Sequence, residues 1–71
     1  MNFVTAKIKK RVALREARKA KGFTQAALAK ELGVTIEHVK SLEYGRVNPS
    51  APLMFKICKV LEKQPDELFD A

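Results

Sequence analysis

The stretch TQAALAKELGVTIEHVKSLEYG, residues 24–45, contains two short segments with apolar residues at helical spacing. Leu28 and Leu32 fall on one side of the first segment, and Val39 lies on the corresponding side of the second. A single glycine, Gly33, separates the two segments. Such a break forms either a corner inside a small helical core or a pair of helices held at a fixed angle, with the second one presented to a partner.

Local signals predict where these two helices begin and end. Thr24 and Thr35 each precede a segment and can accept a hydrogen bond from a free N–H in the first helical turn. Each threonine follows an apolar residue that suits a hydrophobic staple. Gly33 should end the first helix with positive φ, and Gly45 closes the second, which runs from Ile36 to about Tyr44.

The flanking sequence predicts three more helices and no sheet. Residues 12–21 form an amphipathic helix that stops at Gly22, and Ser50 can cap a fourth helix. The apolar stripe of that fourth helix consists of Met54, Ile57, Cys58 and Leu61. The final residues, QPDELFDA, form a short helical turn. The expected fold class is therefore all-α, a compact five-helix domain over residues 12–71 that follows a basic arm, residues 1–11.

The N-terminal segment is strongly basic, whereas the rest of the chain is nearly neutral. The chain of 71 residues has a net charge of +6, and residues 1–22 contain eight basic residues and one acid. A basic segment of this kind suits a polyanion, with nucleic acid first and an anionic membrane surface second. FVTAKI, residues 3–8, reads equally as a short strand or as an arm. Lys7, Lys9, Lys10 and Arg11 either follow a DNA backbone or minor groove or only solubilise the arm.

Composition excludes several classes of function. The chain has one cysteine, Cys58, and one histidine, so we expect no intrachain disulfide, no metal site and no cofactor. Cys58 falls on an apolar stripe and is interpreted as an inert core thiol. We expect no catalytic residues, because the sequence contains no nucleophile–base pair and no glycine loop for phosphates. No apolar run is long enough to cross a membrane, so a cytoplasmic protein is expected.

The second helix of the opening stretch has a continuous outward face. Once the buried positions are set aside, this face consists of Ile36, Glu37, Lys40, Ser41 and Tyr44. A helix with an outer face of this kind fits the major groove of B-DNA, where base edges are read. The sequence therefore predicts a presented helix rather than a simple corner.

The segment LREARKAKGFTQAALAKELGVTIEHVKSLEYGRVNPS resembles the helix-turn-helix domains of the lambda-Cro and phage-repressor type. The matching features are an Arg four residues before Gly22, then TQxxLAxxLGV, then LExG at the end of the recognition helix. The similarity extends over residues 12–69. NPS and DELF are similar to those of short stand-alone bacterial regulators, including restriction-system controllers. The resemblance implies an ion pair between Arg18 and Glu43, and it implies that Gln25 contacts a phosphate.

The candidate DNA-binding residues combine this resemblance with the outward face. They are Thr24, Gln25, Thr35, Ile36, Glu37, His38, Lys40, Ser41, Tyr44 and Arg46. Relatives often have a polar or basic residue in place of Ile36, and Asn or Arg in place of Tyr44. Isoleucine can pack on a thymine methyl group and Glu37 can accept from a cytosine amino group, but these residues do not define an operator.

Two functions remain open at this stage. The first is a sequence-specific transcriptional regulator, bacterial or phage-encoded and nucleoid-associated, that acts as a repressor. It would bind double-stranded DNA as a homodimer on an inverted repeat, with Phe55, Leu68 and Phe69 as candidate interface residues. The second is an antitoxin or adaptor that uses the same fold to bind a protein partner. The apolar character of Ile36 and Tyr44 on an outward face favours the second function.

Overall fold

The computed structural model describes residues 10–69, which form five helices and contain no strand. The helices are α1 (Val12–Ala20), α2 (Gln25–Leu32), α3 (Ile36–Tyr44), α4 (Ala51–Leu61) and α5 (Pro65–Phe69). The predicted all-α, five-helix class is therefore confirmed for this part of the chain. The choice between a strand and an arm falls on residues 1–9, which lie outside the described residues.

Three helices begin at the side-chain caps that the sequence predicts. The hydroxyl of Thr24 accepts from the backbone N–H of Ala27 at 3.0 Å, and that of Thr35 accepts from His38 at 3.1 Å. Ser50 caps α4 in the same way. Each cap satisfies one of the N–H groups that has no partner within its own helix. The entry to α2, α3 and α4 is thus encoded by single residues.

The turn between α2 and α3 depends on one left-handed glycine. Gly33 has φ +75°, and its N–H bonds to the Lys30 carbonyl at 3.2 Å. The next residue, Val34, donates to the Ala29 carbonyl at 3.0 Å. These bonds close the end of α2 within two residues. As a result, α3 starts immediately, at a fixed angle to α2.

The core consists of ten buried apolar side chains, and every helix contributes to it. They are Leu14, Ala17, Leu28, Ala29, Leu32, Val39, Leu42, Ile57, Leu61 and Leu68. The sequence misjudged one position in α4, where Leu53 rather than Met54 packs against this core. The reason is helical spacing, because Leu53 lies one full turn before Ile57 and on the same line as Leu61. Phe23 and Val34, the predicted staple residues, also pack against the core.

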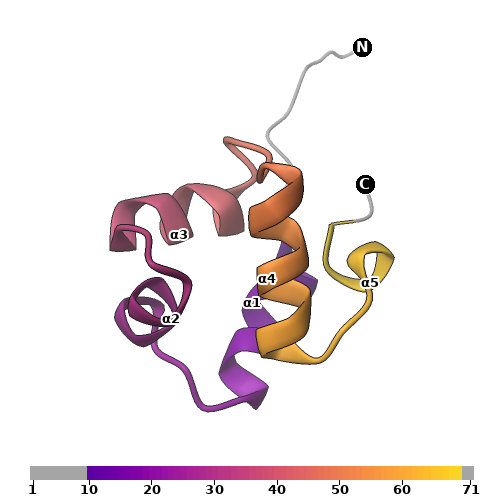
Figure 1. Cartoon of the computed structure of the whole chain (residues 1–71), viewed down its shortest axis with the longest axis horizontal. Helices are drawn as coiled ribbons and strands as arrows, with labels where there is room; N and C mark the ends of the chain where they lie inside the picture. Colours follow the sequence, from indigo (N-terminus) through magenta and orange to yellow (C-terminus); the bar gives the residue numbers. More distant parts are fainter. Residues whose placement is uncertain (1–9, 70–71) are drawn as a thin grey trace, which may run out of the picture.

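The arrangement of the helices leaves α3 at one side of the molecule. In Figure 1, α4 stands at the centre, with α2 and α3 to its left and α5 to its right. α2 packs most extensively against α3, while α1 contacts both α3 and α5. α3 therefore rests on α1 and α2 by its inner face.

We expect the substitution Gly33→Ala to lower the free energy of unfolding by about 1–2 kcal/mol, the usual penalty for a left-handed alanine. A Cβ at this position would meet nothing within 4 Å, so the strain is confined to the backbone. Gly33→Asn, which tolerates this conformation better, should lose less. Urea unfolding followed by circular dichroism measures both values. A loss of helix in Gly33→Ala without denaturant would contradict this assignment.

Candidate nucleic-acid interface

The outward face of α3 carries the polar and apolar side chains that the sequence assigns to DNA. Ile36 is 38% exposed and Tyr44 is 42% exposed, so both large side chains are accessible from solvent. Glu37 is exposed, and its carboxylate lies 3.6 Å from the ammonium of Lys40, one turn along the helix. Ser41 is half-buried beside them. Together these residues form one continuous surface from the first turn of α3 to the last.

The inner face of α3 fixes the orientation of this surface. Val39 is 1% exposed and Leu42 is 2% exposed, and both belong to the core. On α2 the small side chain of Ala29 is also buried in that core, which allows the two helices to approach closely. Because interiors pack at crystal-like density, α3 cannot rotate about its axis without opening a cavity. The side chains on its outer face therefore keep a defined direction.

The starts of α2 and α3 carry the capping residues Thr24 and Thr35, for which the sequence also predicts DNA contacts. Thr24 and Thr35 accept backbone N–H groups, yet each hydroxyl keeps its own proton for donation to another acceptor. Both threonines are exposed, and the neighbouring His38 is half-buried. The positive end of each helix dipole lies here, which favours an anion such as a phosphate. DNA contacts by these residues remain predictions.

A buried ion pair ties the first helix to the end of α3. The Arg18 Nε atom lies 2.5 Å from Glu43 Oε2, and both side chains are nearly inaccessible to solvent. Arg18 also donates to the Phe23 carbonyl at 2.8 Å, at the entry to α2. Gln25 Nε2 donates to Glu43 Oε1 at 3.1 Å. The pair is thus part of a network that joins α1, α2 and α3.

This network changes the interpretation of Gln25. Its carboxamide has two N–H donors, and one of them serves Glu43 in the structure. The second N–H donor is left for an acceptor such as a phosphate oxygen, and the carbonyl oxygen is left for a donor group. Gln25 therefore positions the end of α3 in addition to the contact that the sequence assigns to it.

Arg11 is a structural residue that the sequence analysis placed wrongly in a basic arm. Its backbone N–H donates to the Glu43 carbonyl at 2.8 Å. Its guanidinium donates to the Leu42 carbonyl at 2.6 Å, to the Val47 carbonyl at 2.8 Å and to Asn48 Oδ1 at 2.5 Å. Arg11 therefore belongs to the folded domain, because its contacts cap the last turn of the recognition helix and the loop after it.

Two further features describe the surroundings of Arg11. Its guanidinium lies over the ring of Phe69, 5.5 Å from the centroid, and so connects α5 with the end of α3. Burial lowers the pKa of Arg11, although an arginine remains charged at neutral pH. A charge in this position is bonded to carbonyls rather than left for DNA. Composition alone could not reveal this, because Arg11 follows Lys9 and Lys10 in one basic run.

Tyr44 holds two cations on its ring at the end of α3. The Lys10 ammonium lies 5.1 Å from the ring centroid and the Arg46 guanidinium lies 5.0 Å from it. Such cation–π contacts restrict the long side chains without neutralising them. The exposed end of α3 is therefore more basic than its own sequence indicates.

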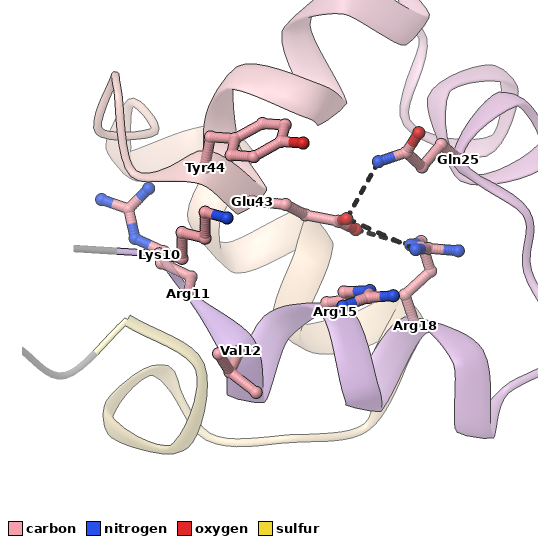
Figure 2. Close-up of a pocket in the computed structure, with 8 residues that line it drawn as sticks. All are labelled: Lys10, Arg11, Val12, Arg15, Arg18, Gln25, Glu43 and Tyr44. Atoms are coloured by element: carbon pink, nitrogen blue, oxygen red, sulfur yellow. Dashed lines mark hydrogen bonds and ion pairs between the residues drawn. The ribbon is translucent and has the colours of Figure 1, made fainter. Parts of the chain in front are cut away.

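A pocket of about 330 Å³ opens between the start of α1 and the end of α3. Half of its lining residues are cationic, and the lining consists of Lys10, Arg11, Val12, Arg15, Arg18, Gln25, Glu43 and Tyr44. Figure 2 shows Tyr44 and Gln25 on one side of Glu43, with Arg15 and Arg18 on the other. The sequence analysis assigned no role to Arg15. Its position one helical turn before Arg18 and Lys19, which places these basic residues on one side of α1, could have indicated a shared basic surface.

The candidate interface residues lie in different environments. Phe55 on α4 is 62% exposed, and Phe69 is half-buried against the core. Leu68 is only 3% exposed because it fills the core between α1, α4 and α5. The sequence placed Leu68 at a subunit interface, and the structure instead places it inside its own chain. Only Phe55 and Phe69 remain as surface candidates.

The described residues offer little for other chemistry. Among residues 10–69 no group of three metal-ligating side chains comes together, and no helix there is long and apolar enough to cross a membrane. Burial, followed by the negative charge of Glu67, raises the pKa of the Cys58 thiol. A thiol with a raised pKa is a poor nucleophile at neutral pH, which agrees with its interpretation as an inert core group.

Comparison with known proteins identifies the family. A helix-turn-helix family model matches residues 14–68, which include all or nearly all of each helix in the structure. The chain belongs to the helix-turn-helix family of the Cro and phage-repressor type. An HTH-type transcriptional regulator from Archaeoglobus fulgidus is 42% identical over 59 residues, covering 83% of this chain and 84% of that protein. The regulator YazB from Bacillus subtilis is 38% identical over 55 residues, covering 78% and 80%.

Solved structures of helix-turn-helix regulators share this fold. The restriction-modification controller protein C.AhdI from Aeromonas hydrophila has a TM-score of 0.73 and 37% identity, covering 87% of this chain and 90% of that one. The clp gene regulator ClgR from C. glutamicum has a TM-score of 0.68 and 34% identity, covering 75% and 68%. These findings place this helix-turn-helix protein among DNA-binding transcriptional regulators, as the motifs predict.

We expect Glu43→Gln to lower the free energy of unfolding by about 3–5 kcal/mol, because it leaves the Arg18 charge buried without a counter-ion. The double variant Arg18→Met with Glu43→Leu should be more stable than Glu43→Gln, since it removes both charges. Urea unfolding of the three proteins measures the difference. Equal stability of Glu43→Gln and wild type would show that the pair does not hold the helices together.

We expect Arg11→Lys to keep the charge but to destabilise the end of α3, because one ammonium cannot replace the three guanidinium hydrogen bonds. The loss should be about 1–3 kcal/mol, and amide exchange should accelerate at Gly45 and Arg46. The amides of α2 serve as the internal control for a global change. Unchanged exchange at the end of α3 would assign Arg11 to the surface instead.

Proposed function

We propose that this protein reads a specific DNA sequence by inserting α3 into the major groove. The single observation that carries the proposal is the rigid seating of α3, whose inner face lies in the core while Ile36, Glu37 and Ser41 face outward. A rigid helix with polar and apolar side chains on its outer face suits the groove, where each base pair presents its own pattern of contacts. The positive net charge supports binding to the backbone.

The base contacts follow from the chemistry of these side chains. Ile36 supplies an apolar contact to a thymine methyl group, and Glu37 accepts from a cytosine amino group. The Glu37 carboxylate is 3.6 Å from the Lys40 ammonium, an exposed contact that is worth little in free energy but limits repulsion from the phosphates. The polar residues at the helix starts position the protein on the backbone rather than select the sequence.

We further propose that the protein acts as a homodimer on an inverted repeat and represses transcription by blocking polymerase. One recognition helix discriminates weakly, because each mismatch costs only about 1–3 kcal/mol. Two copies would place their α3 helices about 34 Å apart in successive grooves. The exposed Phe55 and the half-buried Phe69 support an apolar subunit contact on the side of α4 and α5. The solved controller protein C.AhdI, which has the same fold, supports a regulatory role.

A protein-binding role, as an antitoxin or adaptor, is the second candidate. The exposed Ile36 and Phe55 favour it, because exposed apolar side chains often mark a protein contact. Tyr44 no longer favours it strongly, since its ring already carries Lys10 and Arg46. The two candidates separate by whether changes in α3 alter base preference or only the affinity for a protein.

Selection of duplex DNA from a random pool, at about 0.15 M salt to suppress non-specific binding, tests the proposal. We expect an enriched inverted repeat with half-sites about one helical turn apart. Ile36→Ala should relax selection for thymine at one position by about 1 kcal/mol, the low end of a mismatch penalty. Gln25→Ala should lower the affinity for all DNA sequences by the same factor. The absence of any enriched sequence would favour a protein partner, and a single half-site would exclude the symmetric dimer.

A further inference from the structure

The pocket between α1 and α3 contains cationic groups that are not bonded to other groups of the domain that the structure describes. Of its four cationic side chains, Arg11 is bonded to carbonyls and Arg18 is paired with Glu43. Lys10 lies over the Tyr44 ring, which orients its charge but leaves it intact. Arg15 is exposed, and its guanidinium forms no hydrogen bond or ion pair with residues 10–69. Two cations therefore remain available at this pocket.

Glu43, the one carboxylate among the described residues that line the pocket, does not cancel these two charges. Both oxygens of Glu43 are already used, one by Arg18 at 2.5 Å and the other by Arg18 and Gln25 at 3.3 and 3.1 Å. Its negative charge is therefore matched by the buried Arg18. The net positive field of the pocket comes from Lys10, Arg11 and Arg15, of which only Lys10 and Arg15 keep free donors, so an anion is the ligand that its chemistry favours.

The donors around the pocket match a phosphate group. A free guanidinium binds phosphate oxygens in a bidentate manner, and an ammonium adds a point charge. The Tyr44 hydroxyl, which Figure 2 shows directed across the gap toward Gln25, can supply a third donor. A cavity of about 330 Å³ admits a phosphate together with part of the sugar beside it.

The position of the pocket indicates where that phosphate comes from. Gln25, at the start of α2, and Tyr44, on the outer face of α3, line the pocket and also belong to the proposed DNA surface. Lys10, Arg15 and Tyr44 are all exposed, so a free anion would be held only by charges screened by water. A backbone phosphate is different, because the rest of the interface already holds it at a high local concentration.

We infer that this pocket receives a DNA backbone phosphate beside the bases read by α3, with Arg15 and Lys10 as its cationic ligands and the Tyr44 hydroxyl as a third donor. This inference rests on the proposed function and deepens it. It extends the contact with DNA from α2 and α3 to the first turn of α1. Contacts to phosphate strengthen binding without selecting sequence.

The test compares two double variants that remove the same charge. K10Q/R15Q empties the pocket of its free cations, whereas K19Q/K59Q removes two exposed lysines that do not line it. Affinity is measured over a range of salt on the selected duplex and on a mixed-sequence duplex. We expect the slope of log K against log salt to become shallower by about 0.9 in K10Q/R15Q relative to the control, the value for one phosphate. The loss of affinity should be equal for both duplexes, because a phosphate contact does not select sequence.

Two further variants separate a local contact from a loss of folding. R15K should restore part of the affinity, because it returns the charge without the bidentate geometry. Tyr44→Phe should lower the affinity for both duplexes by the same factor, because it removes the hydroxyl donor but keeps the aromatic ring that contacts Lys10. The unfolding temperature of each variant is measured alongside, and it should stay near that of wild type, since Lys10 and Arg15 are exposed.

Three results would overturn the inference. Equal salt slopes for the two double variants would show that only the overall charge matters. Micromolar inorganic phosphate, at constant ionic strength, could displace DNA from wild type but not from K10Q/R15Q, which would assign the pocket to a free anion. If the wild-type protein bound no DNA at all, the proposed function itself would fail. If the wild-type protein bound DNA but K10Q/R15Q behaved like its control, only the inference about the pocket would fail.

Discussion

The buried ion pair between Arg18 and Glu43 is the interaction on which the orientation of α3 depends. It joins the last turn of α1 to the end of α3, and through Gln25 and the Phe23 carbonyl it reaches the start of α2. Hydrophobic packing of the inner face of α3 prevents its rotation, but apolar contacts are non-directional and still permit small displacements. Directional bonds between buried charges tolerate far less displacement. The pair therefore sets how α3 sits on the rest of the domain.

A second set of bonds, made by Arg11, secures the same end of α3 from another side. A helix ends with carbonyl groups that have no partner, and Arg11 supplies donors to Leu42 and to the loop at Val47. Its contact with Phe69 connects this end to α5. The recognition helix is thus fixed at its start by Thr35 and at its end by arginines from α1 and its N-cap. Such preorganisation limits the entropy lost when α3 enters a groove.

The four basic residues that line the pocket divide into two roles according to burial. Arg11 and Arg18 are structural, since their donors are used inside the domain. Lys10 and Arg15 face a pocket at the edge of the reading surface, where their charges remain available. A net charge of +6 therefore overstates what is offered to DNA at any one place. The distinction matters because only exposed cations release counter-ions from a duplex.

The sequence by itself determined the helices, their caps and the family, because these depend on interactions within a few residues. The hydroxyl caps and Gly33 are local, and apolar periodicity reports which face is buried. Only the tertiary structure decided the roles of Arg11 and Leu68. Arg11 bonds to carbonyls 31 and 36 residues away, and Leu68 fills a space between other helices. Neither fact is encoded in spacing, since both depend on how distant elements meet in three dimensions.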